Sequence, residues 1–136
     1  MNRITQVLLL ASGLIYAWIG VYFLFWPEHG TAAIGVAMLD DTGRTDIMAT
    51  YGGLMLGIAA MYGWFLWDKG RYQVGLWLTL LTCAGLAFGR LTAISGGERP
   101  GAMMWAFLVL ELSAVALSTA LLKRMVSEDS QSESNR

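Results

Sequence analysis

The sequence predicts an all-α fold, a four-helix transmembrane bundle with both termini on the cytoplasmic side. Hydrophobic residues make up 56% of the 136-residue chain, and they gather in four runs long enough to cross a bilayer. The polar and apolar alternation of membrane strands is absent, and backbone groups in lipid must pair internally, which favours helices. Basic residues fall mainly on one side of the four runs. Together these observations predict both the fold class and its orientation.

The apolar runs define four expected spans, at about residues 4–26, 47–67, 72–94 and 102–122. The first ends at Trp26-Pro27, because proline interrupts a helix. In the long loop that follows, Thr31–Leu39 is apolar enough for a short interfacial helix, and Asp40–Gly43 is typical of a turn. Thr45 or Asp46 can then cap the second span.

Short links join the remaining spans. Asp68–Arg71 connects the second span to the third, and Ser95–Pro100 connects the third to the fourth. Links this short make consecutive helices antiparallel neighbours. The transmembrane domain is therefore expected to cover residues 1–124. The polar, Ser-rich residues 125–136 predict a disordered cytoplasmic tail.

The charge distribution predicts which side faces the cytoplasm. The basic residues on the side of the two termini are Arg3, Lys69, Arg71, Lys123, Arg124 and Arg136. The opposite side carries only Arg44 and Arg99 among five acidic residues. The positive-inside rule therefore places both termini of a multi-pass membrane protein in the cytoplasm. A net charge of −1 gives no support for nucleic-acid binding.

Two charged residues interrupt the last two spans, Arg90 near the end of the third and Glu111 near the middle of the fourth. Ionisable groups at membrane depth are costly, so they usually face the bundle interior and often mark function. Helical side chains tilt toward the N-terminus of their own helix, so these two lean toward each other from antiparallel helices. We expect them to meet, directly or through one water. Ala114 and Ser118 share the Glu111 face and suit a packed interface.

Two interpretations of this pair stay open. It is either a structural ion pair that fixes helix packing, or the polar floor of a pocket open to the outer side. In the second case Tyr51, Gly52 and Gly53 line a cavity beside Arg90, which holds an anionic or carbonyl head group of a lipophilic ligand. The other polar residues of the outer half that can converge there are Arg44, Asp46, Glu98 and Arg99.

Other residues that can carry chemistry have simpler interpretations. Two pairs of glycines four residues apart favour close helix packing, and these are Gly53 with Gly57 and Gly85 with Gly89. The single histidine, His29, has too few neighbouring ligands for a metal site, and we expect neither metal nor cofactor. Cys83, the only cysteine, is interpreted as a small buried residue.

Three stretches carry a family resemblance: RTDIMATYGGLMLG at Arg44–Gly57, LAFGRL around Arg90, and ELSAVAL beginning at Glu111. Through them the chain resembles a family of small four-span bacterial membrane proteins known only as a domain of unknown function. It is also distantly similar, by architecture, to four-helix DoxX-like proteins. The resemblance covers nearly the whole chain except the tail and implies four helices. Because the resembled family is bacterial, we expect a multi-pass protein of the bacterial inner membrane. The residues that match its polar and glycine positions are Tyr51, Gly52, Gly53, Arg90 and Glu111.

Three classes of function follow. The leading one is a non-enzymatic accessory or scaffold subunit that binds a membrane complex or another copy of itself, because no catalytic motif appears. The second is a binder or carrier of a lipophilic molecule, a lipid or a quinone, in the outer-half pocket. The third is a proton-coupled carrier or membrane enzyme that uses Glu111 and Arg90. Membrane lipids are partners in all three.

Overall fold

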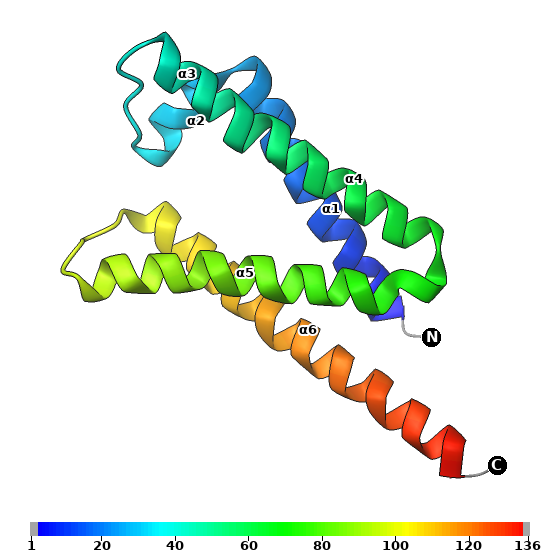
Figure 1. Ribbon diagram of the computed structural model, residues 1–136. Coiled ribbons are helices and arrows are strands. Elements are labelled where there is room, and N and C mark those ends of the chain that lie inside the picture. Colours follow the sequence, from blue (N-terminus) through cyan, green and yellow to red (C-terminus); the bar gives the residue numbers. More distant parts are fainter. Residues whose placement is uncertain (1–2, 135–136) are drawn as a thin grey trace. The chain divides into compact units, whose positions relative to one another are not determined.

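A computed structural model describes residues 3–134, and each regular element in that range is helical (Figure 1). The elements are α1 (Arg3–Phe25), α2 (Pro27–Ile34), α3 (Asp41–Ile47), the π-helix η1 (Met48–Leu54), α4 (Met55–Trp67), the 3-10 turn η2 (Lys69–Arg71), α5 (Tyr72–Ser95) and α6 (Ala102–Ser134). The helical stretches long and apolar enough to cross a membrane are Arg3–Phe25, Asp41–Trp67, Tyr72–Ser95 and Ala102–Ser127. The predicted all-α fold with four apolar spans is confirmed.

The chain divides into two helical units, Met1–Lys69 and Gly70–Arg136. In the first unit α1 packs along η1 and α4, and in the second α5 packs along α6. Figure 1 shows both helix pairs as antiparallel. The short link after Ser95 predicts this arrangement for α5 and α6.

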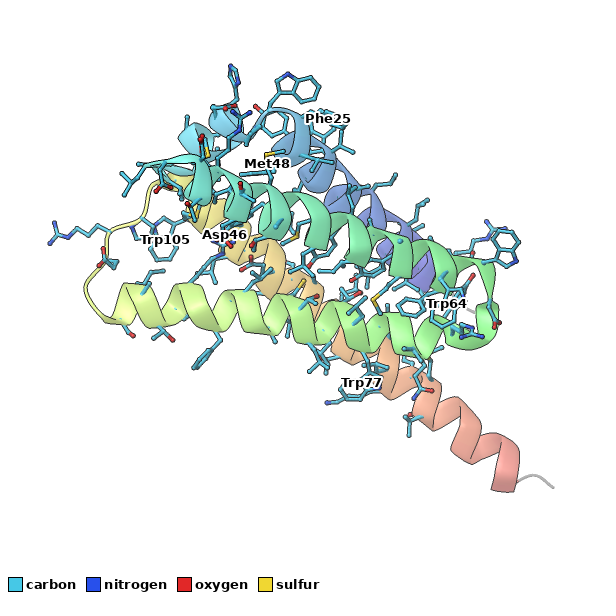
Figure 2. All side chains as sticks on the ribbon, turned by 45° about the horizontal axis from the view of Figure 1, so that its top comes forward. Phe25, Asp46, Met48, Trp64, Trp77 and Trp105 are labelled. Atoms are coloured by element: carbon cyan, nitrogen blue, oxygen red, sulfur yellow. The ribbon has the colours of Figure 1, made fainter. Side chains whose placement is uncertain are left out.

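Large apolar side chains cover much of the outer surface of the helices. Phe25, Trp64 and Trp77 are 66%, 55% and 47% exposed, and they project from the ribbons in Figure 2. Apolar exposure on this scale is unfavourable in water, whereas lipid tails can cover it in a bilayer. The four apolar helices and their exposed surfaces fit a multi-pass membrane protein.

The buried face of α1 follows a seven-residue repeat. Leu9, Tyr16 and Phe23 are all buried, because this spacing keeps one stripe of a helix turned toward a neighbouring helix. The ring of Tyr16 stacks on that of Tyr62 in α4, with centroids 5.8 Å apart and planes 17° from parallel. These contacts form the core of the first unit.

Glycines let α1 and α4 approach closely. A Cβ added at Gly20 would lie 2.7 Å from Leu56 Cγ, and one at Gly13 would lie 2.9 Å from Tyr62 Cβ. Larger residues at these positions would push the helices apart and reduce the contacts that hold membrane helices together.

The glycine pairs singled out in the sequence do not make such contacts. A Cβ added at Gly53, Gly57, Gly85 or Gly89 would meet no atom within 4 Å. These four glycines therefore do not mediate the close packing of α1 with α4 or of α5 with α6. Each helix is rotated so that a face other than the one with these glycines packs against the other helix of its pair.

The loop after α1 contains a helix, though not where its apolar residues predict one. Pro27 begins α2, since proline suits the first helical position. Gly35 ends it with a left-handed φ of 75°. The N–H groups of Gly35 and Val36 donate to the carbonyls of Ala32 and Thr31, which satisfies the helix end. The helix therefore covers Pro27–Ile34 rather than Thr31–Leu39.

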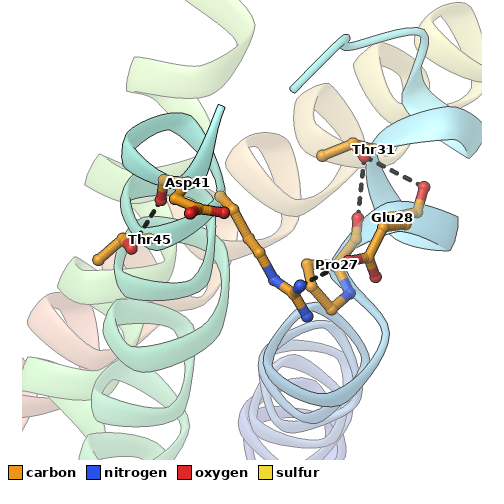
Figure 3. A network of polar contacts seen from close by, with 6 residues as sticks. Pro27, Glu28, Thr31, Asp41 and Thr45 are labelled. Atoms are coloured by element: carbon orange, nitrogen blue, oxygen red, sulfur yellow. Dashed lines mark hydrogen bonds and ion pairs between the residues drawn. The ribbon is translucent and has the colours of Figure 1, made fainter. Parts of the chain in front are cut away.

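The next helix begins earlier than predicted. Asp40 caps α3, because its Oδ1 accepts a hydrogen bond from the Gly43 N–H at 2.8 Å. The predicted turn at Asp40–Gly43 is thus a helix start, and the predicted cap at Thr45 or Asp46 is wrong. Thr45 lies inside α3, where its hydroxyl donates back to the Asp41 carbonyl at 2.8 Å (Figure 3).

The last helix passes the change in composition after Leu122. It continues to Ser134, and the Ser127 hydroxyl donates to the Lys123 carbonyl at 2.9 Å. Leucine, lysine, arginine and methionine are good helix formers, which explains how the helix leaves the apolar run without ending. The helix α6 thus extends beyond the predicted span 102–122. The domain boundary at residue 124 and the cytoplasmic location of the tail stay predictions, and residues 135–136 lie outside the described range.

Candidate functional site

The candidate site lies where α5 and α6 face each other. The buried residues on this stripe of α5 are Leu76, Thr79, Cys83 and Ala87. Those on the facing stripe of α6 are Leu108, Glu111, Ser118 and Leu122. Intervals of three, four and seven residues keep each set on one helix face. Arg90 follows Ala87 by three residues, so it extends the α5 stripe.

Arg90 and Glu111 are in direct contact. Arg90 Nε donates to both carboxylate oxygens of Glu111, each at 3.0 Å. Arg90 Nη2 lies 2.9 Å from Glu111 Oε1. The side chains are 26% and 7% exposed, so the pair is mostly removed from solvent. The contact joins α5 to α6, and the two charges neutralise each other.

The other edge of the Arg90 guanidinium lies against soft, apolar groups. Arg90 Nη1 is 3.1 Å from the sulfur of Met104, and Cζ is 5.4 Å from the centroid of the Phe107 ring. The ring face attracts the cation, but a thioether is a weak hydrogen-bond acceptor. Within the described helices α5 and α6, Nη1 has no oxygen acceptor. Arg90 therefore has hydrogen-bonding capacity that these two helices do not satisfy.

Sequence-based reasoning missed Met104 and Phe107. They precede Glu111 by seven and four residues, which places them near its face of the helix. Their helical spacing from Glu111 could have indicated that both residues lie near the ion pair. They were not singled out because apolar residues occupy almost every position of this span.

The same interface also buries polar groups beyond the ion pair. Ser118 and Thr79 are both 0% exposed. Thr79 donates to the Gly75 carbonyl at 3.0 Å, whereas Ser118 Oγ has no hydrogen-bond partner in the described chain. Cys83 is a buried free thiol, as predicted. Small residues of this kind suit a packed interface between membrane helices.

The remaining candidates from the second predicted span lie in the first unit. Tyr51 belongs to η1, and its ring stacks on Phe23 with centroids 5.1 Å apart. Gly52 is buried, and a Cβ there would lie 3.2 Å from Leu24 Cδ1, whereas Gly53 is open. Irregular π-helical turns occur often at functional sites. An outer-half pocket shared by these residues with Arg90 stays a prediction.

The charged loop candidates are exposed. Arg44 Nη1 lies 3.1 Å from Glu28 Oε1, with side chains 50% and 54% exposed (Figure 3). An exposed ion pair of this kind contributes about 0–1 kcal/mol. Asp46, on α3, is also exposed (Figure 2). Within residues 3–134, no three His, Cys, Asp or Glu side chains gather closely enough to hold a metal ion.

Comparisons with known proteins give one match. The sequence model of a family described as Domain of unknown function (DUF4345) matches residues 4–122. The match therefore includes both helix pairs and both residues of the ion pair. No curated protein and no solved structure matches significantly. The family description carries no activity, so the function has to be argued from the site.

Proposed function

The chain belongs to the DUF4345 family, a domain of unknown function, and from this premise we propose that it is a small membrane protein that binds a lipophilic molecule through Arg90. One observation carries the proposal. Glu111 holds the Nε and Nη2 side of the guanidinium, while within the described α5–α6 pair Nη1 meets only a thioether sulfur. An arginine fixed in this way presents oriented donors to an incoming acceptor.

The position of Arg90 supports a lipophilic ligand. Arg90 lies five residues before the end of α5 at Ser95, within one of the four apolar spans. At about 1.5 Å per residue, it is about 7.5 Å from that helix end. A molecule that reaches this depth dissolves in the bilayer, and its polar group meets the guanidinium.

A contribution to stability does not by itself explain why the chain carries this ion pair. Replacing a buried ion pair by hydrophobic residues of similar size is often neutral or stabilising, because removing the charges from water costs as much as their attraction returns. A purely structural role could thus be filled by apolar residues. A binding role explains why Arg90 is present and why Glu111 holds it in place.

The other predicted functions have less support from particular contacts. An accessory or scaffold role, with a membrane-protein partner or a second copy, stays a prediction. So does a proton-coupled carrier or a membrane enzyme. A protein partner could also supply an acceptor to Arg90, so these functions compete with the binding of a lipophilic molecule.

We also propose that both termini face the cytoplasm and that the protein lies in a bacterial inner membrane. The support is the gathering of basic residues at the termini and in the link before α5. A reporter that is active only in the cytoplasm should work when fused after Arg136. It should be inactive when inserted in the loop between Gly35 and Asp40. The opposite pattern would contradict this orientation.

Ligand binding can be tested by identifying what the purified protein carries. Wild-type protein is extracted from membranes in mild detergent, and its bound lipophiles are identified by mass spectrometry. We expect one species in stoichiometric amount. The variant Arg90→Leu/Glu111→Leu should retain about tenfold less of it, the loss expected for one charge-assisted hydrogen bond.

Two exposed residues outside the candidate pocket offer a matched control. Glu28→Leu/Arg124→Leu removes one glutamate and one arginine and should leave the bound species unchanged. Identical amounts of lipophile on the wild type and on both double variants would contradict the proposed function.

A further inference from the structure

We infer that the group held by Arg90 is a neutral carbonyl oxygen rather than an anion. The inference rests on the proposed function, since it names the chemistry of the ligand at the same site. It follows from the charges and donors around the guanidinium.

The Glu111 carboxylate already neutralises Arg90. Its oxygens lie 3.0 Å from Nε and 2.9 Å from Nη2, and its side chain is only 7% exposed. A phosphate or carboxylate at Nη1 would share this guanidinium with a second negative charge that water screens poorly. Repulsion between the two anions would offset much of the attraction to Arg90. A carbonyl oxygen gains the hydrogen bond without that repulsion.

The donors and surfaces at Nη1 also suit a carbonyl. Nη1 carries N–H donors that diverge in the guanidinium plane, so one of them can donate to a lone pair of a carbonyl oxygen, and no charge is needed on that acceptor. The Met104 sulfur at 3.1 Å is a weak acceptor on a flexible side chain, so an oxygen can displace it. The Phe107 ring lies under the guanidinium, with its centroid 5.4 Å from Cζ, so it makes the surroundings of the donors apolar. The site therefore favours an uncharged carbonyl with apolar surroundings.

Two sources supply such a carbonyl in a membrane. One is the ester group of a glycerolipid, and the other is a free lipophile such as a quinone. Both present an uncharged sp² oxygen, so the chemistry at Arg90 is the same. The experiment has to separate them.

The full-length protein is reconstituted in nanodiscs of ether-linked phosphatidylcholine, which contains no ester carbonyl. Three probes with the same chain are titrated: decyl-1,4-benzoquinone, decyl-1,4-dimethoxybenzene and decyl phosphate. We expect the quinone to bind about tenfold more tightly than the dimethoxy compound, which lacks a carbonyl. Arg90→Leu/Glu111→Leu should abolish this difference. Met104→Leu removes the competing sulfur and should bind the quinone at least as tightly as the wild type.

The outcomes separate the two proposals. If decyl phosphate binds most tightly and loses affinity in the double variant, Arg90 binds a lipophile but the carbonyl inference is overturned. If no probe distinguishes the wild type from the double variant, the proposed function is overturned as well. Repeating the quinone titration in ester-linked nanodiscs identifies the source. Weaker apparent binding there shows that lipid esters compete for Arg90, and unchanged binding shows that a free carbonyl compound is preferred.

Discussion

Removing one partner of the Arg90–Glu111 pair should destabilise the α5–α6 helix pair by about 3–5 kcal/mol. Glu111→Gln leaves the guanidinium without its carboxylate, and Arg90→Leu leaves a carboxylate that is 7% exposed without a cation. The cost arises because the remaining charge stays buried and unpaired. We expect a lower folded yield in detergent and a lower midpoint of thermal unfolding for each single variant.

The double variant Arg90→Leu/Glu111→Leu separates this explanation from general damage to packing. It removes both charges together, so its free energy of unfolding should lie within about 1–2 kcal/mol of the wild type. A double-mutant cycle gives the coupling energy between the two residues. Single variants that match the wild type in yield and unfolding midpoint would contradict a tight pair. So would a double variant as unstable as the sum of the two single variants.

Gly20→Val should disrupt the first unit. A Cβ at Gly20 would lie 2.7 Å from Leu56 Cγ and 2.9 Å from the Leu56 backbone nitrogen. A flexible side chain can move away, but the backbone of α4 can do so only by separating from α1. Overpacking of this kind costs about 1–3 kcal/mol, and the extra methyl groups of valine place the effect at the upper end. The measurement is thermal unfolding in detergent.

Gly57→Val is the matched control in the facing helix. A Cβ at Gly57 would meet no atom within 4 Å, so the change should stay within about 0.5 kcal/mol of the wild type. Equal destabilisation by the two variants would show that Gly57 also lies in a close contact. An unaffected Gly20→Val variant would contradict the close approach of α1 and α4.

The fold could be predicted because the bilayer leaves few alternatives for long apolar runs. The element boundaries were harder. Asp40 has the same local chemistry in a turn and in a helix cap, so its side chain alone does not distinguish them. The π-helical turn at Met48–Leu54 was not predicted either, since it depends on how the helix packs rather than on its composition.

The site could be predicted in part. Arg90 and Glu111 stand out as charges in apolar runs, and the tilt of helical side chains was enough to pair them. Met104 and Phe107 could not be singled out among similar residues, although their helical spacing from Glu111 places them nearby. The glycine pairs lie outside the contacts within each helix pair, because spacing shows which residues share a face, but not which face meets the neighbouring helix.

Solid-state NMR in a lipid bilayer can test whether Arg90 donates a hydrogen bond to a carbonyl of the ligand. Protein labelled with ¹⁵N-arginine is mixed with decyl-1,4-benzoquinone carrying ¹³C at its carbonyls, and magnetisation transfer between the two labels is measured. A hydrogen bond from Nη1 places the carbonyl carbon about 4 Å from the nitrogen. We predict transfer to a guanidinium nitrogen in the wild type and none in Arg90→Leu/Glu111→Leu. No transfer in the wild type, or equal transfer in both proteins, would contradict ligand binding through Arg90.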